Sequence, residues 1–319
     1  MNNTNDSDHC NTTADFQFYL FPIIYILAVS GGLLGNLRAL YVFIFKIKQI
    51  SPSNVYIINL AVADTIFLCS LPFRIHYHLN RNDWIFGDLA CRITGSVYFA
   101  NIYISIAFMT CICVDRYIAT VHPHTYLRLR NTRCTVMVSA AIWTLTGSAM
   151  LAFILAGPFE TIGSRHNGPI PRSCFENFSQ DEWSKRLTPY SACSLVLGSL
   201  VPSLVILVCY PLVARRIARI RTGTARGALR LIYAILAITL LCFLPYHVVH
   251  LLHLLRRTQF IKHCTVADGI YKARRVTMAM VSLNSLLDPV LYFFATNHCK
   301  WQMPRFKKTK GVYTISGSL

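Results

Sequence analysis

Seven long apolar runs separated by short polar links constrain the fold of this chain more than any other feature of its 319 residues. A helix needs about 20 consecutive apolar residues to cross roughly 30 Å of hydrocarbon. The runs that reach this length are 18–45, 55–79, 92–121, 134–157, 188–214, 228–255 and 270–295. The pattern predicts an all-α membrane protein built as one bundle of seven transmembrane helices.

The composition agrees with lipid as the surrounding solvent. Hydrophobic residues make up 54% of the chain and charged residues only 14%, which is too apolar for a soluble domain of this size. We expect an extracellular glycosylated tail at 1–17, a transmembrane domain at 18–295 and a short cytoplasmic tail at 296–319. The polar, acidic start differs from a cleavable leader, so the first span is expected to direct insertion of a multi-pass plasma-membrane protein.

The orientation follows from glycosylation signals and acidic residues. An odd number of spans places the two termini on opposite sides of the membrane, and all four N-x-Ser/Thr signals fall on the N-terminal side, which predicts an extracellular N-terminus. The predicted cytoplasmic loops and tail contain no Asp or Glu, which sharpens a weak excess of Lys and Arg there. The predicted glycosylation sites are Asn2, Asn5, Asn11 and Asn177.

Four of the 12 cysteines fall on the predicted outer side: Cys10, Cys91, Cys174 and Cys264. An even number in an oxidising compartment suggests two disulfides, with three alternative pairings. We favour Cys91–Cys174 together with Cys10–Cys264, where the first ties a long loop to a helix end and the second ties the N-terminal tail. Both are expected to be structural.

Asp115 and Arg116 stand side by side near the end of the third apolar run. Charges inside a membrane are costly and usually mark a function or a satisfied partner. Arg116 follows Cys91 by 25 residues, or about 37 Å of helix, which places the acid–base pair at the inner end of the span. A purely structural ion pair would explain the pattern equally well.

With these residues in view, the sequence resembles the rhodopsin-like (class A) G-protein-coupled receptors from about residue 18 to 300. The resemblance depends on landmarks in every span. They are Gly35-Asn36, NLAVAD (59–64), Cys91, DRY (115–117), Trp143, Pro202 with Tyr210, CFLPYH (242–247) and DPVLY (288–292).

The resemblance implies that Asp115 holds Arg116 in the inactive receptor and releases it to meet a heterotrimeric G protein. The residues that it assigns to this activation switch are Asp115, Arg116, Tyr117, Tyr210, Phe243, Pro245 and Tyr292. Phe243 stands where many members of the family have Trp, so the internal relay is expected to be set differently here.

A second polar cluster is expected around Asp64. Pairs four residues apart project from one helix face, so residues on the third and seventh helices point toward Asp64 together. Oxygen ligands around a buried carboxylate suit a hard cation, and the family holds sodium there. The predicted sodium ligands are Asp64, Asn101, Ser105, Asn284 and Asp288. A hydrogen-bond network without an ion is the alternative, and no other cofactor is expected.

Basic side chains at the outer helix ends predict an anionic ligand. An arginine guanidinium suits phosphate oxygens, and aromatic and apolar residues below it suit a hydrocarbon chain or a ring. The predicted ligand-binding residues are Arg74, Arg92, Tyr98, Tyr103, Tyr246, His247, His250, Lys272, Arg274 and Arg275.

Three outer segments, 71–88, 174–187 and 256–264, resemble the purinergic-like branch of the family, and the last two are most similar to its lysophosphatidic acid receptors. A lysophospholipid is therefore the expected ligand. NIYISIAF at 101–108 also resembles proton-sensing members. Proton-sensing, nucleotide-activated and constitutively active receptors remain alternatives, and an ion channel is a more distant one.

The inner face carries basic residues that suit membrane lipids and a G protein. The short tail holds few Ser and Thr residues, so arrestin binding is expected to be modest, and Cys299 is a candidate palmitoylation site. The chain contains no enzyme motif, and neither catalysis nor a nucleic-acid partner is expected.

Overall fold

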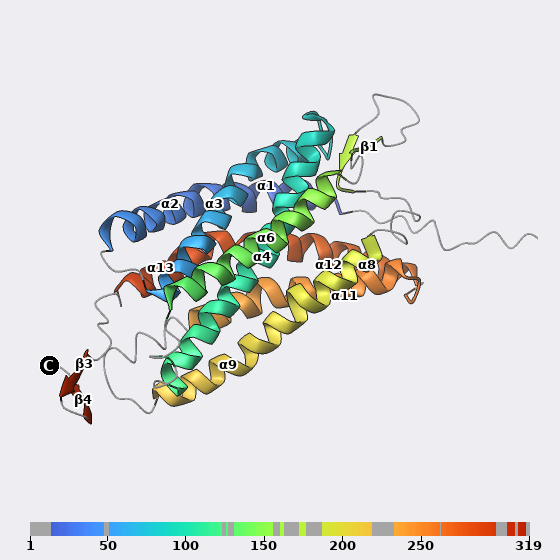
Figure 1. Ribbon diagram of the computed structural model, residues 1–319. Coiled ribbons are helices and arrows are strands. Elements are labelled where there is room, and N and C mark those ends of the chain that lie inside the picture. The colour runs from blue at the N-terminus through green and yellow to red at the C-terminus, as the bar shows by residue number, and fades with distance from the viewer. Residues whose placement is uncertain are drawn as a thin grey trace, which may run out of the picture.

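The computed structural model describes residues 14–47, 51–122, 126, 131–155, 160–162, 172–176, 187–218, 233–261, 263–297, 305–309 and 312–316. Long helices packed side by side form a single bundle, as Figure 1 shows. A helix satisfies its own backbone hydrogen bonds, which is why hydrocarbon favours this architecture.

The helical elements follow the seven predicted runs. The first run holds α1 (Gln17–Leu27), α2 (Leu33–Tyr41) and two short π-helical stretches, η1 (Ala28–Gly32) and η2 (Val42–Lys46). The next three are α3 (Pro52–Leu79), α4 (Gly87–Val121) and α6 (Thr132–Leu155). The last three are α8 (Thr188–Leu195) with η4 (Val196–Leu200) and α9 (Val201–Ala218), then 233–238 with η5 (Thr239–Phe243) and α11 (Leu244–Arg257), then α12 (Cys264–Ser282) with α13 (Asn284–Asn297).

Among the described residues, six helical segments are long and apolar enough to cross a membrane: 17–46, 52–79, 87–119, 132–155, 188–216 and 233–257. The seventh segment is divided at Leu283, and its N-terminal half carries Asp268, Lys272, Arg274 and Arg275. These charges explain why it is less apolar than the others. The all-α, seven-helix prediction is confirmed.

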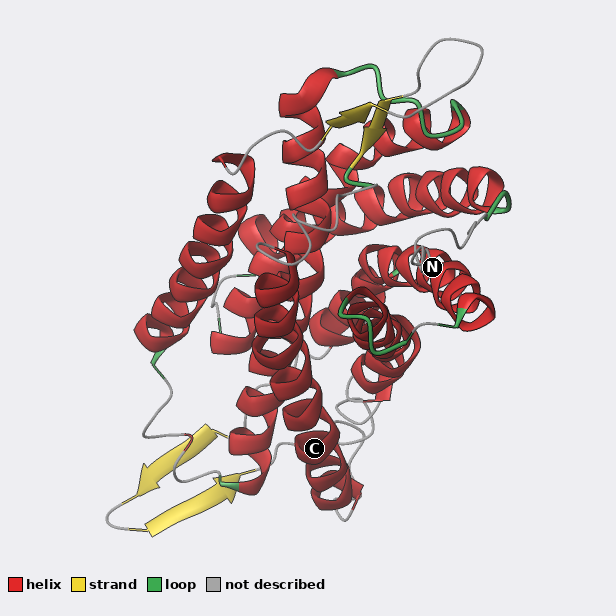
Figure 2. Ribbon diagram, turned by 90° about the vertical axis from the view of Figure 1, so that its right-hand side faces the viewer, coloured by secondary structure: helices red, strands yellow, loops and turns green. Residues whose placement is uncertain are grey.

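A short hairpin covers one end of the bundle. Strand β1 (Glu160–Ile162) pairs antiparallel with β2 (Arg172–Cys174), and Glu160 lies opposite Cys174. Cys174 is bonded to Cys91 on α4 with a Cα–Cα distance of 5.7 Å, which confirms the first predicted disulfide. Strands β3 (Arg305–Thr309) and β4 (Val312–Ser316) form a second antiparallel hairpin at the other end (Figure 2).

Cys264 also forms a disulfide. Its predicted partner, Cys10, lies outside the described residues, as do Asn2, Asn5, Asn11, Asn177 and Cys299. The second pairing, the glycosylation sites and the palmitoylation site therefore stay predictions.

The first and seventh segments approach each other closely at glycine. A Cβ atom added to Gly35 would lie only 2.5 Å from Cγ of Pro289. One residue further along, the Asn36 amide donates to the Ser285 carbonyl oxygen at 2.9 Å, and Asn36 is fully buried. The missing side chain at Gly35 is what allows the two helices to come within hydrogen-bonding distance.

We predict that Gly35→Ala destabilises the bundle by about 1–3 kcal/mol, because overpacking forces the two helices apart. Gly147→Ala is the matched control, since a Cβ there meets nothing within 4 Å. Thermal unfolding of the purified protein in detergent measures the difference, and equal melting temperatures for the two variants would contradict this account of the packing.

Candidate functional site

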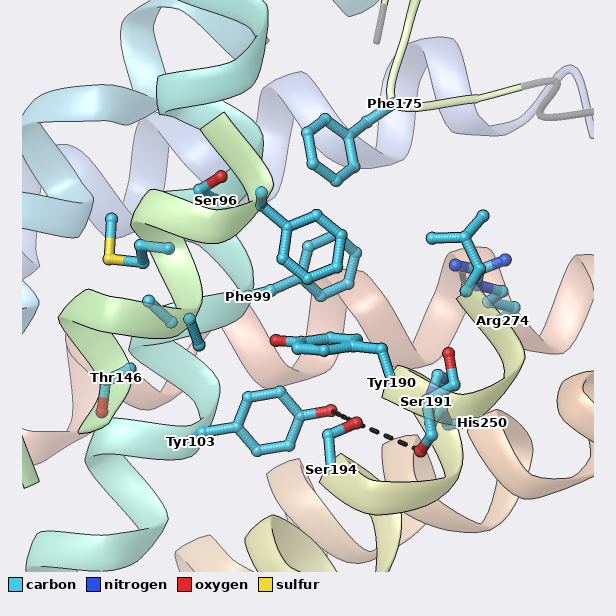
Figure 3. A pocket seen from close by; sticks show the side chains of 15 residues that line it. Ser96, Phe99, Tyr103, Thr146, Phe175, Tyr190, Ser191, Ser194, His250 and Arg274 are labelled. Atoms are coloured by element: carbon cyan, nitrogen blue, oxygen red, sulfur yellow. Dashed lines mark hydrogen bonds between the residues drawn. The ribbon is translucent and has the colours of Figure 1, made fainter. Parts of the chain in front are cut away.

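A large cavity, here called the major pocket, lies near the hairpin-covered end of the bundle between α4, α6 and α8 (Figure 3). It encloses about 730 Å³ of empty space, part of it open to solvent. Its walls are mainly aromatic and aliphatic. The lining residues are Ser96, Phe99, Ala100, Tyr103, Thr146, Ala149, Met150, Phe153, Phe175, Leu187, Tyr190, Ser191, Ser194, His250 and Arg274.

Arg274 and His250 form the basic side of the major pocket. The Arg274 guanidinium donates to Nε2 of His253 at 2.6 Å, and since arginine only donates, that nitrogen accepts and the His253 ring is neutral. The His250 ring stacks on Tyr246 with centroids 5.8 Å apart. Within the described part of the chain, neither ring nitrogen of His250 has a hydrogen-bond partner, although His250 is only 8% exposed.

A few hydroxyl groups interrupt the apolar wall. The Tyr103 hydroxyl donates to Ser194 at 3.1 Å, and Ser194 donates to the Ser191 carbonyl oxygen at 3.1 Å, as the dashed lines in Figure 3 show. This chain of hydroxyls fixes the Tyr103 ring against α8. Apolar walls with a few oriented polar groups are typical of small-molecule sites.

A second cavity, here called the minor pocket, encloses about 520 Å³ between the first helix, α3, α12 and the loop after β2. It shares Phe99, Phe175 and Arg274 with the major pocket. The residues that line the minor pocket are Phe21, Tyr25, Arg74, His78, Phe99, Cys174, Phe175, Glu176, Tyr271, Arg274, Arg275 and Met278.

Glu176 is an acid within this basic cavity that sequence reasoning missed. The Arg275 guanidinium donates to Glu176 Oε1 at 2.7 Å and to the Tyr271 hydroxyl at 2.8 Å. Burial opposes ionisation of Glu176, but the charge and hydrogen bond of Arg275 outweigh it, so the pKa of Glu176 lies below its usual value. The available signal was an acidic residue two positions after Cys174, in a loop held down by the disulfide.

The other predicted ligand residues take different places. Arg74 is buried and lies over the Tyr98 ring, 4.5 Å from its centroid, and Tyr98 donates to the Met278 carbonyl oxygen at 2.7 Å. Tyr246 and His247 are buried on α11. Arg92 pairs with Asp88 and Lys272 with Asp268, and neither cation lines the two pockets.

Deeper in the bundle, Asp64 is fully buried and forms the centre of a polar cluster. Its carboxylate accepts hydrogen bonds from the Asn101 amide at 3.1 Å, Ser285 at 2.6 Å and Tyr292 at 3.3 Å. Tyr292, a predicted member of the activation switch, is thus bonded to the Asp64 cluster. Ser285 was not predicted.

The donor set of this cluster fits a hard cation. The Asn284 amide nitrogen donates to Asp288 at 3.1 Å. The Asn284 amide oxygen, the other Asp288 oxygen and the Ser105 hydroxyl are buried and have no hydrogen-bond partner among the described residues. Buried oxygen acceptors without donors are costly. A cation bound between them would satisfy these oxygens.

Near the C-terminal end of α4, Ser53 connects the predicted acid–base pair. The Ser53 hydroxyl, in the first turn of α3, donates to Asp115 and accepts from Arg116. Arg116 Nε lies 3.9 Å from Asp115 Oδ2. The serine of a neighbouring helix thus bridges the two charges, and sequence reasoning did not identify it.

The remaining switch residues lie on several segments of the bundle. Tyr210 on α9 and Phe243 in η5 are fully buried, and Pro245 lies in the first turn of α11. The Tyr117 ring packs edge to face against His122, with centroids 5.7 Å apart. Tyr117 thus lies on the same helix as Asp115 and Arg116, whereas Tyr210 and Phe243 lie on two other segments.

A comparison with known protein families identifies the chain. The family described as 7 transmembrane receptor (rhodopsin family) matches residues 35–292. The chain belongs to this family. Purinoceptor 1 of Meleagris gallopavo is 35% identical over 307 residues, which cover 94% of this chain and 83% of the relative.

Two further relatives bear the names of lipid receptors. Lysophosphatidic acid receptor 6 of Gallus gallus is 33% identical, and the match covers 91% of this chain and 94% of the relative. Cysteinyl leukotriene receptor 2 of Homo sapiens is 33% identical, with coverages of 98% and 90%. The predicted purinergic-like branch, with its similarity to lysophosphatidic acid receptors, is confirmed. The protein is a multi-pass G-protein-coupled receptor of the plasma membrane, and its family implies G-protein coupling.

We predict that Glu176→Gln lowers the receptor's stability at pH 7 by about 3 kcal/mol, because it leaves the buried Arg275 charge without its partner. The folded-state pKa of Glu176 is depressed, so its contribution is complete above the ordinary value of 4.5 and is lost as the pH falls further. The melting temperature, measured by thermal unfolding at pH 7 and below pH 4.5, should therefore fall less on acidification for Glu176→Gln than for the wild type.

Asp268→Asn is the matched control, since it removes the acid of a more exposed pair on α12, which is worth about 0–1 kcal/mol. A Glu176→Gln receptor as stable at pH 7 as the Asp268→Asn variant would contradict a structural role for the Glu176–Arg275 pair.

Proposed function

We propose that this receptor is activated by an extracellular anionic amphiphile, with a lysophospholipid such as lysophosphatidic acid as the favoured ligand, and that it then promotes nucleotide exchange on heterotrimeric G proteins. The observation that carries the proposal is the major pocket, an apolar cavity bordered by Arg274 and His250. We assign the end that holds Cys91–Cys174 to the outside, because disulfides persist in oxidising compartments.

The basic side of the pocket supports an anionic head group. Among the described residues, Arg274 has no carboxylate partner, and its contact is with the neutral ring of His253. Arg274 is partly buried, and a guanidinium that loses water without gaining a counter-ion is destabilised. A phosphate group provides both the charge and the hydrogen-bond acceptors, and the ring of His250 can donate to its oxygens.

The apolar walls support a hydrocarbon chain. Phe99, Met150 and Phe153 contribute apolar surface to the lining of this pocket, and mainly apolar walls are usual in ligand sites. A nucleotide would require more polar partners for its base and ribose. The names of the relatives are compatible with both ligand classes, so the chemistry of this pocket carries the choice.

The buried histidines weigh against a proton-sensing receptor. His253 accepts from Arg274, and His247 and His250 are buried without a hydrogen-bonded acid among the described residues. A proton added to His253 would place a second positive charge beside Arg274. The acid-activated alternative therefore receives little support from these three side chains.

We predict that Arg274→Glu weakens the G-protein response to lysophosphatidic acid by well over tenfold, because a charge-assisted hydrogen bond is worth about 1.5–3 kcal/mol. Lys272→Glu is the matched control, since Lys272 lies on the same helix but outside both pockets. Concentration–response curves for nucleotide exchange in membranes measure the effect.

Two results would contradict the ligand assignment. One is a normal response of the Arg274→Glu receptor to lysophosphatidic acid. The other is activation of the wild type by a nucleotide, or by acidification to about pH 6.5 without lipid, the latter being near the ordinary pKa of histidine.

At the inner end, Asp115, Ser53 and Arg116 form the latch that releases the G-protein-binding arginine. The proposal rests on their hydrogen bonds and on the family, whose members use this arginine to meet the G protein. Sodium, when bound by Asp64, Asn101, Ser105, Asn284 and Asp288, would supply a positive charge that neutralises the buried carboxylates.

We predict that Arg116→Ala abolishes nucleotide exchange on G protein but leaves ligand affinity within about threefold, a change below 1 kcal/mol. Asp115→Asn and Ser53→Ala should both raise basal exchange, because each weakens the inactive contacts of Arg116. Arg133→Ala, on the exposed start of α6, is the control. Full signalling by Arg116→Ala would remove the latch from the mechanism.

A further inference from the structure

Phe175 stands between the major and minor pockets and lines both of them. It belongs to the loop directly after β2, and its ring lies 5.8 Å from that of Phe99 on α4. Figure 3 shows Phe175 reaching from the loop toward the side of the pocket where Phe99 lies. The two cavities also share Arg274, so an aromatic boundary and one cation connect them.

The Phe175 ring occupies a position that exists only because residue 95 is glycine. A Cβ atom added to Gly95 would lie 2.1 Å from Cδ2 and 2.2 Å from Cε2 of Phe175. These distances are far below van der Waals contact, so the ring rests directly on the backbone of α4. Any side chain at position 95 would displace it.

The backbone of Phe175 is held in an unfavourable conformation. Its φ angle of 59° lies in the left-handed region, which bulky residues avoid. Both neighbours are fixed, since Cys174 is bonded to Cys91 and Glu176 pairs with Arg275. Strained residues persist where the surroundings determine them, and they gather at ligand sites.

We propose that Phe175 is a partition that divides one potential ligand chamber into two and thereby selects amphiphiles with one hydrocarbon chain. The inference rests on the proposed function for the class of ligand. With the ring in place, a phosphate at Arg274 directs a single chain into the major pocket. The minor pocket is closed to a second chain by the ring and contains the charged pair Glu176–Arg275.

Removal of the ring joins the two cavities at the cation that they already share. The joined chamber has room for a second chain beside the Tyr25, Phe99 and Met278 side chains, while Arg274 still holds the head group. Phe175 is therefore a specificity-determining residue, and Gly95 positions its ring.

The test compares binding of lysophosphatidic acid and of phosphatidic acid with the same acyl chain to the purified receptor in nanodiscs. The wild type should prefer the one-chain lipid by roughly tenfold or more, as expected for rejection by pocket size. Phe175→Ala should lose most of this preference, and Gly95→Ala should change it in the same direction because its new methyl group unseats the ring. Phe175→Leu replaces the alanine variant if that variant does not fold.

Two controls separate the partition from a general loosening of the site. Phe73→Ala removes an aromatic ring on α3 that lines neither pocket, and Gly147→Ala adds a methyl group in open space. Both should keep the preference of the wild type. An unchanged preference in the Phe175 variant and in Gly95→Ala, or an equal loss in Phe73→Ala, would overturn the proposal.

A ligand-free structure of the Phe175→Ala receptor distinguishes failure of this inference from failure of the proposed function. One continuous chamber in that structure supports the partition even if the wild type binds neither lipid, in which case the lysophospholipid assignment alone fails. Two cavities that remain separate, because Phe99 and its neighbours close the gap, would overturn the partition.

Discussion

The energetic cost of an unpaired charge in a low-dielectric interior governs the organisation of this receptor. Hydrocarbon cannot solvate polar groups, so the helices place nearly all of their charged and amide side chains inside the bundle or at its ends. Asn36, Asp64 and Asn101 each find hydrogen bonds with a different helix. The polar interior therefore specifies which helices are neighbours, in addition to the packing of their apolar faces.

The same energetic cost explains why the basic residues near the hairpin-covered end of the bundle differ in their partners. Arg275 is paired with Glu176, Lys272 with Asp268 and Arg92 with Asp88. Among the described residues, Arg274 has no ion pair and donates its hydrogen bond to a neutral histidine ring. Basic residues that look alike in the sequence therefore differ in the folded protein, because some have an acidic partner and others do not. Of the two pocket-lining arginines without a carboxylate partner among the described residues, Arg74 borders only the minor pocket, whereas Arg274 also borders the major pocket.

Several features could be predicted because each depends on spacing along one helix or on a motif. They are the apolar runs, the Cys91–Cys174 disulfide, the Asp115–Arg116 pair and several members of the Asp64 cluster. Three contacts could not be predicted, because each depends on how a loop or a second helix packs against a helix distant in sequence. They are those of Glu176, of Ser53, and of the Phe175 ring with Gly95. Glu176 is adjacent in sequence to the disulfide loop, but its partner lies 99 residues away on α12. Nothing local in the sequence marks Arg275 as paired and Arg274 as available.

The interruption of the seventh segment at Leu283 has a mechanical consequence. The backbone N–H of Leu283 bonds to Met280 with the tighter spacing of three residues, so the regular ladder of the helix is broken there. Its outer half carries Arg274, while its inner half is pressed against the first helix through Pro289 and Gly35. This turn separates the half of the segment that carries Arg274 from the half that carries the buried Asp288, so a bend at Leu283 would change the position of one relative to the other.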